Sequence, residues 1–409
     1  MSAPLPGPVP IVDDVDTVTS RGHEDDPTTT GLGHATVASL WESVQSWYRM
    51  GTTPAIQVCV RRNGAIVLNR AIGHAWGNAP GDRADTAGVL VTPDLPFCGF
   101  STAKGVAGAM MFLLIEQGAF ALDDRVCDYI PEFATHGKAA ITIGDVLSHS
   151  AGIPFLPPAY RGIDVIADEE LAVRALVDLV PSWKPGRFRV YHALTGGLIL
   201  RLLVQRATGK RLREHLAEEV LEPFGFRWTN FGVAAEDIDG VVPSVRIGPA
   251  PSRLTRHLAH KAIGGEMDRT PGLAERFLTA ELPSGNLVTT ATELARFYEI
   301  LTHGTPDGRR IIRPQTLARA VQPARWIPGV AGRVSRAGFE LGARRSKFGR
   351  NTTAHFGRSG LTTQYGWADA ARGLSGAILT SGKAVADADR PWRLVAQISA
   401  AVPPDRQDP

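Results

Sequence analysis

Segments typical of β-strands lie near both ends of this 409-residue chain, and helical patterns fill most of its middle. Near the N-terminal end, residues 55–61 and 65–69 form two strand-like runs joined by Asn63-Gly64, a dipeptide that favours the tight turn of a β-hairpin. Near the C-terminal end, further strand-like segments occur at 354–356, 364–367 and 374–380. This arrangement predicts an α/β (α+β) fold, with one antiparallel sheet built from both chain ends and flanked by helices, plus a mainly helical second domain.

The same pattern predicts where the domains begin and end. The sheet domain is discontinuous and comprises residues 34–104 and 271–402, whereas residues 105–270 form the mainly helical domain. Residues 1–33 are rich in Pro, Gly, Asp and Thr and are expected to form a flexible tail. The segment 247–275 fits either a loop or a lid, and the sequence leaves open whether it covers a site.

The composition excludes several classes of protein. With 44% hydrophobic residues, the chain is globular rather than disordered. Its net charge of +3 is spread over residues of both signs, which gives no indication of nucleic acid or an acidic membrane as a partner. Cys59, Cys98 and Cys127 are too few, and odd in number, for a disulfide framework, so we expect a reduced, cytoplasmic protein.

No segment predicts export or membrane insertion. The first ten residues contain neither the basic nor the apolar region of a signal peptide. The longest apolar run, within Val106–Ile115, is too short to span a bilayer. The absence of both signals agrees with the expected cytoplasmic location.

Ser101 and Lys104 form a Ser-x-x-Lys pattern at the start of a strongly helical, apolar segment, 105–118. Residues three apart on a helix share one face, with Cβ atoms about 5–6 Å apart. Burial disfavours the ammonium form of a lysine, and a helix N-terminus offers N–H groups and positive potential to a developing oxyanion. The pattern therefore predicts a serine nucleophile activated by a lysine. The alternative is that Ser101 merely caps the helix and Lys104 extends to solvent.

Further segments resemble, in the same order along the chain, the motifs of one enzyme family. They are 141–153 (ITIGDVLSHSAGI), 183–186 (WKPG), 191–193 (YHA), 221–225 (LEPFG), 284–297 (SGNLVTTATELARF) and 355–357 (HFG, where the family has K-T-G or H-x-G). The chain thus resembles the penicillin-recognising serine hydrolases, specifically the class C β-lactamase-like branch. That branch includes D-alanyl-D-alanine peptidases, family VIII carboxylesterases and acyltransferases. The resemblance extends over residues 35–395 as one β-lactamase-like unit, and it implies the fold predicted above with the active site between sheet and helices.

The resemblance implies a role for each candidate residue. Ser101 attacks an acyl carbonyl and forms an acyl-enzyme, while Lys104 and Tyr191 share the proton transfers. A tyrosine with a pKa near 10 needs a cationic neighbour to act as a base, and the order in which the two residues act stays open. The oxyanion hole is expected to consist of the backbone N–H groups of Ser101 and Arg358. Expected contacts to substrate come from Phe100, His192, His355, Phe356 and Gly357.

The chain also departs from the family pattern. Ala193 replaces the asparagine of Y-x-N, and His355-Phe356-Gly357 lacks the lysine and threonine that hold a substrate carboxylate in K-T-G enzymes. These changes favour a neutral ester over an anionic lactam, although Arg358 offers another anion site. We therefore predict a serine carboxylesterase. The alternatives are an acyltransferase that uses an amine or alcohol, a β-lactamase or D-Ala-D-Ala peptidase, and a non-catalytic binding protein.

The sequence predicts no metal site and no cofactor. His257 and His260 are one helical turn apart but have no carboxylate or cysteine partner nearby in the sequence, and no phosphate-binding loop is present. His149 is expected only to shape a loop. The expected partner is a small ester or other acyl substrate, and the acyl length, the alcohol and the oligomeric state stay open.

Overall fold

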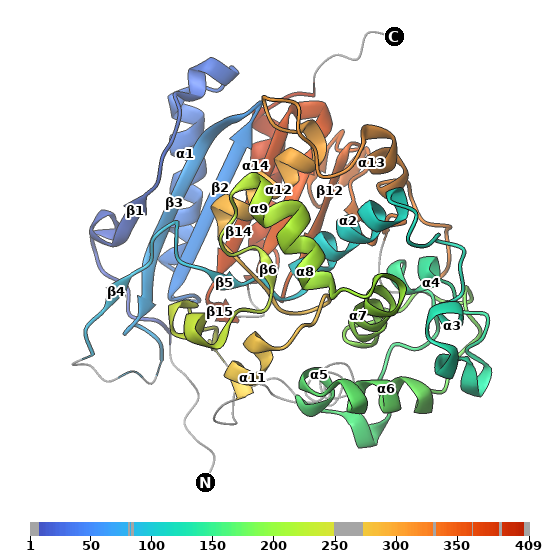
Figure 1. Ribbon diagram of the computed structural model, residues 1–409. Helices are drawn as coiled ribbons and strands as arrows, with labels where there is room; N and C mark the ends of the chain where they lie inside the picture. Colours follow the sequence, from blue (N-terminus) through green and yellow to red (C-terminus); the bar gives the residue numbers. More distant parts are fainter. Residues whose placement is uncertain are drawn as a thin grey trace, which may run out of the picture.

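A large antiparallel sheet joins the two ends of the chain (Figure 1). The computed structural model describes residues 8–80, 82, 86–248, 273–329, 333–361, 363–383 and 387–404. The sheet has the order β1-β3-β2-β14-β13-β12-β9, with β4 added on β3. Its strands are β1 (Thr19–Arg21), β2 (Ala55–Arg62), β3 (Ala65–Trp76), β4 (Val89–Leu90), β9 (Glu340–Leu341), β12 (His355–Ser359), β13 (Tyr365–Asp369) and β14 (Leu374–Thr380).

The N-terminal hairpin and the C-terminal strands meet in the middle of this sheet, as predicted. β2 pairs antiparallel with β14, and Cys59 lies opposite Ala377. The hairpin turn between β2 and β3 places Asn63 at φ 50° and Gly64 at φ 91°. Both residues therefore have the left-handed backbone conformation that a type I′ turn requires, which explains why Asn-Gly is found in this hairpin.

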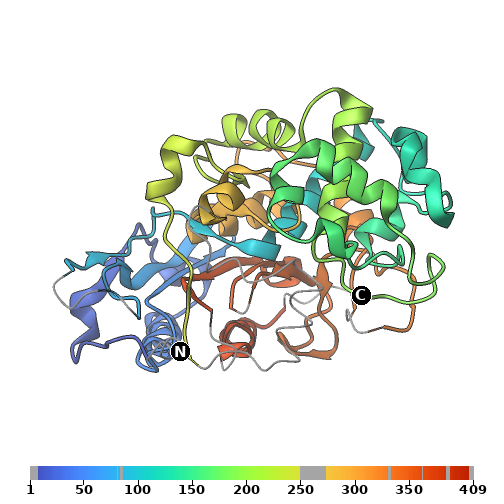
Figure 2. The ribbon, with the colours of Figure 1, turned by 90° about the horizontal axis from the view of Figure 1, so that it is seen from below.

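Helices cover both faces of the sheet, and the alternation of side chains along β2 separates the two layers. Ile56, Val58 and Val60 belong to one hydrophobic cluster with α1 (His34–Tyr48) and α14 (Arg390–Ala401). Ala55 and Cys59 belong to a second cluster with α2 (Ala103–Glu116) and α12 (Ala291–His303). Figure 2 shows the sheet between these two layers.

The remaining elements complete the second layer and the helical region. The helices α3 to α7 gather beyond α2, away from β1 and β3 (Figure 1). The other α-helices are α3 (Val126–Tyr129), α4 (Ile143–Leu147), α5 (Asp164–Ala167), α6 (Glu169–Asp178), α7 (Thr195–Thr208), α8 (Leu212–Leu216), α9 (Glu222–Phe224), α11 (Leu273–Thr279) and α13 (Pro314–Ala320). Short segments of 3-10 or π-helix are η1 (Val15–Val18), η2 (Pro27–Thr30), η3 (Phe100–Thr102), η4 (Pro131–Gly137), η5 (Pro158–Tyr160), η6 (Ala217–Leu221), η7 (Ala235–Gly240) and η8 (Ala370–Arg372).

Among the described residues, three small sheets lie outside the main one. The first has the order β5-β8-β6 and holds the chain just before Ser101, whereas the other two are pairs. Their strands are β5 (Phe97–Cys98), β6 (Asn230–Phe231), β7 (Val245–Arg246), β8 (Leu287–Thr289), β10 (Arg345–Ser346), β11 (Gly349–Arg350) and β15 (Gly382–Lys383).

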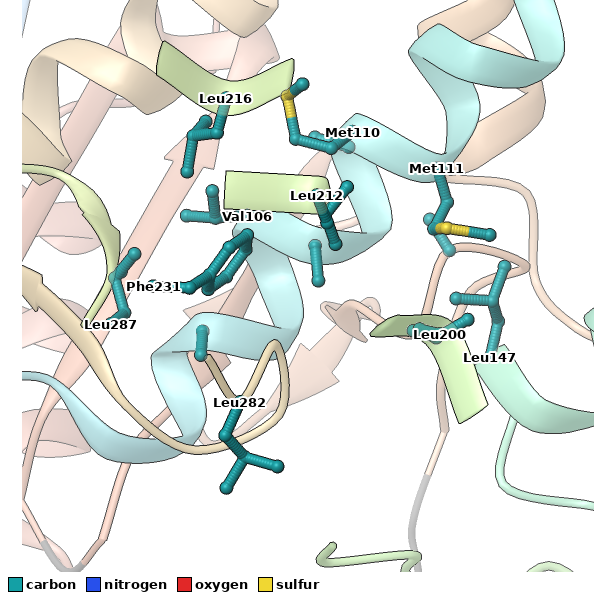
Figure 3. Packing of buried hydrophobic residues seen from close by; sticks show 14 of the residues in the cluster. Val106, Met110, Met111, Leu147, Leu200, Leu212, Leu216, Phe231, Leu282 and Leu287 are labelled. Carbon is teal, nitrogen blue, oxygen red and sulfur yellow. The ribbon is translucent and has the colours of Figure 1, made fainter. Parts of the chain in front are cut away.

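α2 is the central helix of the core. Every residue from Ala103 to Leu114 is buried, which is expected of a helix that is apolar on all sides. Figure 3 shows Val106 and Met110 of α2 near Leu212 and Leu216 of α8. Because α2 is held on all sides, its first turn is a rigid support for the residues at its N-terminus.

One glycine of α2 lies against the loop that precedes β9, and its replacement gives a test of this packing. A Cβ added to Gly108 would lie 2.1 Å from the Ala337 carbonyl oxygen. We expect Gly108→Ala to lower the free energy of unfolding by about 1–3 kcal/mol, as overpacking does. Gly196→Ala in α7 is the control, since its Cβ would lie at an ordinary 3.7 Å from its nearest neighbour. Equal denaturation midpoints for Gly108→Ala and the wild type would contradict this packing.

Part of the segment expected to be a flexible tail belongs to the sheet. Thr19 of β1 lies opposite Ile72 of β3, and the Asp25 carboxylate accepts a 2.7 Å hydrogen bond from the Ile66 N–H. β1 has only three residues and no apolar alternation, so no sequence pattern marked it. The division into sheet and helical domains stays a prediction.

Several sequence-based expectations concern absences. Among the described residues, no helix has the length and hydropathy needed to cross a membrane. The same part of the chain holds no cluster of three or more His, Cys, Asp or Glu side chains suited to a metal ion. Cys59, Cys98 and Cys127 are free thiols. His257, His260 and most of the segment 247–275 lie outside the described residues.

Candidate active site

Ser101 lies in the turn that connects β5 to α2. The preceding residue, Phe100, has φ 48°, a left-handed conformation that is strained for a bulky residue. Such strain persists only where the surrounding structure enforces it, and it is frequent at functional sites. Gly99, before the strained residue, donates its N–H to the Leu287 carbonyl oxygen at 2.8 Å. The turn therefore holds Ser101 in a fixed position at the N-terminal end of α2.

Ser101, Lys104 and Tyr191 come together as the sequence predicts. The Tyr191 hydroxyl lies 2.7 Å from Ser101 Oγ, and Lys104 Nζ lies 3.5 Å from the same oxygen. Lys104 Nζ also donates to the carbonyl oxygens of Ser284 at 2.6 Å and of Ala193 at 3.1 Å. The Ser101 hydroxyl thus contacts two titratable side chains and makes no capping hydrogen bond to α2, so the helix-cap alternative is not supported.

The surroundings shift the pKa values of both titratable partners. Burial lowers the pKa of Lys104 below its usual value. Burial alone would raise the pKa of Tyr191, but the nearby charges of Lys104 and Arg358 outweigh it and lower this pKa to about 8. The Tyr191 ring indeed lies close to both cations, with its centroid 4.6 Å from Lys104 Nζ and 5.3 Å from Arg358 Cζ. Its phenolate form is therefore accessible near neutral pH.

The Arg358 side chain was not predicted to belong to the cluster. It comes from β12 and is buried. Its Nη1 donates to the Gly338 carbonyl oxygen at 2.8 Å, and its Nη2 donates to His149 Nε2 at 3.2 Å. These two acceptors fix the guanidinium beside the Tyr191 ring.

His149 does more than shape a loop. Its φ of 61° is left-handed, and its ring meets the Tyr191 ring edge-on at 5.0 Å between centroids. Its two nitrogens face the Arg358 guanidinium and, at 3.4 Å, the N–H of His192. Burial and the charge of Arg358 hold the pKa of His149 well below its usual range, so the imidazole stays neutral and can accept a hydrogen bond from the guanidinium. This contact joins residues 209 positions apart, which no local motif could reveal.

A small cavity lies behind Lys104. It is lined by His149, His192 and Ser284 and by apolar side chains such as Val146 and Leu200. The apolar lining is consistent with the lowered pKa of Lys104.

A family model described as Beta-lactamase matches residues 35–400. The chain belongs to the β-lactamase family. The esterase/β-lactamase LipL of Mycobacterium tuberculosis is 29% identical over 294 residues, which cover 68% of each chain. Esterase EstB of Burkholderia gladioli is 27% identical over 391 residues, which cover 87% of this chain and 93% of EstB.

Solved structures confirm the predicted β-lactamase fold. A penicillin-binding protein homologue from Caulobacter crescentus superposes with a TM-score of 0.75 at 27% identity and covers 91% of this chain and 99% of its own. A family VIII carboxylesterase has a TM-score of 0.72 at 24% identity, with the same coverage. The fold and the family are therefore those that the sequence motifs indicated.

The sequence-based position of the family's K-T-G motif needs correction. His355 is buried on the face of β12 opposite to that of Arg358, where it stacks on Phe348 at 4.1 Å and bonds through Nε2 to the Tyr365 hydroxyl at 2.8 Å. Phe356 packs against Phe339 at 5.1 Å, and a Cβ on Gly357 would lie 2.7 Å from the Tyr365 hydroxyl oxygen. This arrangement does not fit the substrate contacts predicted for these three residues.

The next three residues, Arg358-Ser359-Gly360, fit the K-T-G pattern better. They supply a cation, a hydroxyl and a glycine, and the cation lies beside Tyr191. A Cβ on Gly360 would lie 2.2 Å from the Gly99 carbonyl oxygen, so the chain passes close to the Ser101 turn just after β12. A shift of three residues moves every side chain of a strand to the opposite face, which explains why His355 points away.

This register also corrects the predicted oxyanion donor. The Gly360 N–H donates to the Gln364 carbonyl oxygen of the neighbouring segment at 2.9 Å, whereas the Ser359 N–H donates to the Glu340 carboxylate at 3.1 Å. Because N–H groups alternate sides along a strand, the Arg358 N–H faces β13, as that of Gly360 does. It is directed into the sheet and does not fit an oxyanion hole.

The other two predicted substrate contacts are largely enclosed. His192 is fully buried; its Nδ1 bonds to the Val190 carbonyl oxygen at 2.7 Å and its Nε2 accepts from the Ile153 N–H at 3.2 Å. Burial lowers the pKa of His192 to about 4, so its imidazole is neutral, and its ring stacks on that of His149. Phe100 is buried and stacks on Phe277 with centroids 6.3 Å apart. The contacts of His192 and of Phe100 therefore do not indicate substrate binding.

Proposed function

We propose that this protein is a serine carboxylesterase that cleaves esters through an acyl-Ser101 intermediate. The observation that carries the proposal is the 2.7 Å contact between Ser101 Oγ and the hydroxyl of Tyr191, a tyrosine flanked by the cations Lys104 and Arg358. Such a constellation provides a nucleophile with an adjacent base. The family membership and the two relatives named as esterases support the same activity.

We assign the first proton transfer to Tyr191. Lys104 Nζ faces three oxygens, two of which are carbonyl oxygens that can only accept, and an ammonium has three protons to donate. Burial lowers the pKa of Lys104, but these acceptors and a neighbouring phenolate favour its charged form. Lys104 then stays protonated and stabilises the Tyr191 phenolate, which takes the proton of Ser101.

Each half-reaction then balances. Ser101 Oγ attacks the ester carbonyl as its proton moves to Tyr191 Oη, and the tetrahedral intermediate collapses when Tyr191 returns this proton to the leaving alcohol. Water attacks the acyl-enzyme with its proton moving to the same phenolate. Transfer of that proton to Ser101 Oγ releases the acid and restores the starting state.

The oxyanion hole requires two N–H donors. The N–H of Ser101 at the start of α2 is one. For the second we propose the N–H of Leu361, because it lies two residues beyond that of Ser359 and so points to the same edge of the strand. This edge lies against the Ser101 turn at Gly360.

The hydrogen bonds that Ser359 makes to a carboxylate of the chain favour a neutral substrate. Its N–H and its hydroxyl both donate to the Glu340 carboxylate. Burial alone would raise the pKa of Glu340, but the charges of Lys347 and Arg358 lower it, so the carboxylate stays ionised. In K-T-G enzymes the corresponding hydroxyl holds a substrate carboxylate, whereas here a carboxylate of the chain already occupies it.

The test compares a neutral ester with an anionic lactam. We expect p-nitrophenyl butyrate to be hydrolysed and nitrocefin to be turned over at least about 10²-fold more slowly, because placing its carboxylate beside that of Glu340 costs several kcal/mol. Glu340→Gln should raise nitrocefin turnover relative to the ester, because it removes the charge at Ser359. Comparable rates on both substrates in the wild type would contradict the proposal and favour a β-lactamase.

The pH dependence tests the role of Tyr191. Because the phenolate is the active form, kcat/KM for p-nitrophenyl butyrate should rise with pH and level off above about 8. Arg358→Met removes a cation that lowers this pKa, so its profile should move to higher pH. The control is His355→Gln on the far side of β12, which should leave the midpoint unchanged. An unchanged midpoint in Arg358→Met would contradict the assignment.

A further inference from the structure

Large apolar side chains gather on one exposed part of the molecule. Trp326 is 82% exposed and Val180 is 64% exposed, while Phe155 and Phe188 are each 37% exposed. A single exposed apolar residue is ordinary, but several together mark a place of interaction. These four residues come from the segments 150–157, 179–190 and 321–329, which contain only coil, bends, turns and residues of two isolated β-bridges, Arg189–Gly329 and Pro323–Ser335.

The three segments lie side by side. The Ser182 N–H donates to the Gly152 carbonyl oxygen at 2.8 Å, which joins the first segment to the second. The Arg189 N–H donates to the Pro328 carbonyl oxygen at 2.8 Å, and Arg189 Nη2 donates to the Arg325 carbonyl oxygen at 2.6 Å, which joins the second to the third. The segments that carry the exposed apolar side chains therefore adjoin one another and do not form separate loops.

The same surface is basic. Lys184, Arg187 and Arg325 are exposed on it, and none of the three segments contains an Asp or a Glu. No acidic residue occurs between Asp178 and Glu214, or between Asp307 and Glu340. Although the net charge is only +3, acidic residues are thus absent from two long stretches of the chain that contain basic ones. We call the seven residues Phe155, Val180, Lys184, Arg187, Phe188, Arg325 and Trp326 the basic–apolar surface.

This surface adjoins the candidate active site. Its first segment begins directly after His149, and its second ends directly before Tyr191. Arg189, which holds the second and third segments together, also donates through Nε to the Ser148 carbonyl oxygen at 2.9 Å. Whatever binds at the basic–apolar surface therefore lies near the residues that surround Ser101.

We propose that the basic–apolar surface binds an anionic lipid surface. Tryptophan and phenylalanine insert at the boundary between lipid head groups and acyl chains, and each Lys or Arg near such a surface adds electrostatic attraction. The mixture of both residue types distinguishes this surface from a nucleic-acid site, where exposed valine would find no favourable contact. The inference is independent of the ester chemistry, although it would bring lipid-borne acyl groups to the site.

Vesicle binding of the full chain tests the inference. In co-sedimentation at low salt, we expect binding to vesicles of phosphatidylglycerol and phosphatidylcholine, and little binding to phosphatidylcholine alone. The triple substitution Lys184→Gln, Arg187→Gln and Arg325→Gln should weaken binding by about 10²-fold, given the usual contribution of each cation. Trp326→Ala should weaken it by about tenfold through loss of apolar burial.

A matched control keeps the result interpretable. Arg344, Arg345 and Arg350 are exposed arginines at the β10–β11 hairpin, outside the basic–apolar surface. Their triple replacement by Gln changes the charge equally and should leave vesicle binding within about threefold. Circular dichroism of each variant verifies folding. No binding to the anionic vesicles would overturn the inference, as would equal weakening by the control or equal binding to a soluble polyanion.

Discussion

Ser101→Ala is expected to reduce the turnover of p-nitrophenyl butyrate by on the order of 10⁶-fold, the loss seen when another serine hydrolase loses its nucleophile. The expectation rests on the position of Ser101 Oγ, which lies within hydrogen-bonding distance of Tyr191 and beside Lys104. Alanine keeps the turn between β5 and α2 but removes the atom that would carry the acyl group. Initial rates with purified wild type and variant measure the effect.

Ser375→Ala is the control for this substitution. Ser375 is a buried serine of β14, which β13 separates from β12, the strand that carries Arg358. It should keep turnover within a few-fold of the wild type. A Ser101→Ala variant that retains more than about one hundredth of the activity would show that another group performs the chemistry.

Tyr191→Phe is expected to lower kcat/KM by about 10²- to 10⁴-fold, the usual contribution of a positioned acid–base group. The substitution removes only the hydroxyl that contacts Ser101 Oγ and keeps the ring between Lys104 and His149. Because the ring keeps its packing, the loss should occur mainly in kcat and not in KM. Steady-state kinetics with an ester series separate the two parameters.

Tyr298→Phe is the matched control. Tyr298 is also a buried tyrosine, and it packs against Phe339 and Phe356 near α2. Its loss of a hydroxyl should leave kcat nearly unchanged. A fall of less than about tenfold in Tyr191→Phe would instead assign the first proton transfer to Lys104.

Local sequence patterns were sufficient to predict most of the fold and the central residues of the site. The hairpin at Asn63-Gly64 and the apolar segment of α2 each have a signature within a few residues. Ser101 and Lys104 were predicted from their shared Ser-x-x-Lys motif and Tyr191 from the separate YHA motif at 191–193, and the order of the motifs along the chain linked them. β1 was missed because three residues, Thr19–Arg21, carry no periodic pattern.

The remaining parts of the site depend on contacts that no local pattern encodes. Both His355-Phe356-Gly357 and Arg358-Ser359-Gly360 end in glycine, and only the strand alternation decides which one faces Tyr191. His149 meets Arg358 across the fold, so its contact with the cluster required the three-dimensional arrangement. The hydrogen bonds from Ser359 to the Glu340 carboxylate also join distant residues. They now support the prediction of a neutral substrate, which was first argued from Phe356.

Covalent trapping tests the central claim most directly. After incubation with a serine-reactive p-nitrophenyl phosphonate, mass spectrometry should find one phosphonyl group per chain, located on the peptide that contains Ser101. Labelling should be absent in Ser101→Ala and slower in Tyr191→Phe. A label on any other residue, or ester hydrolysis by a protein that takes up no label, would contradict an acyl-Ser101 mechanism.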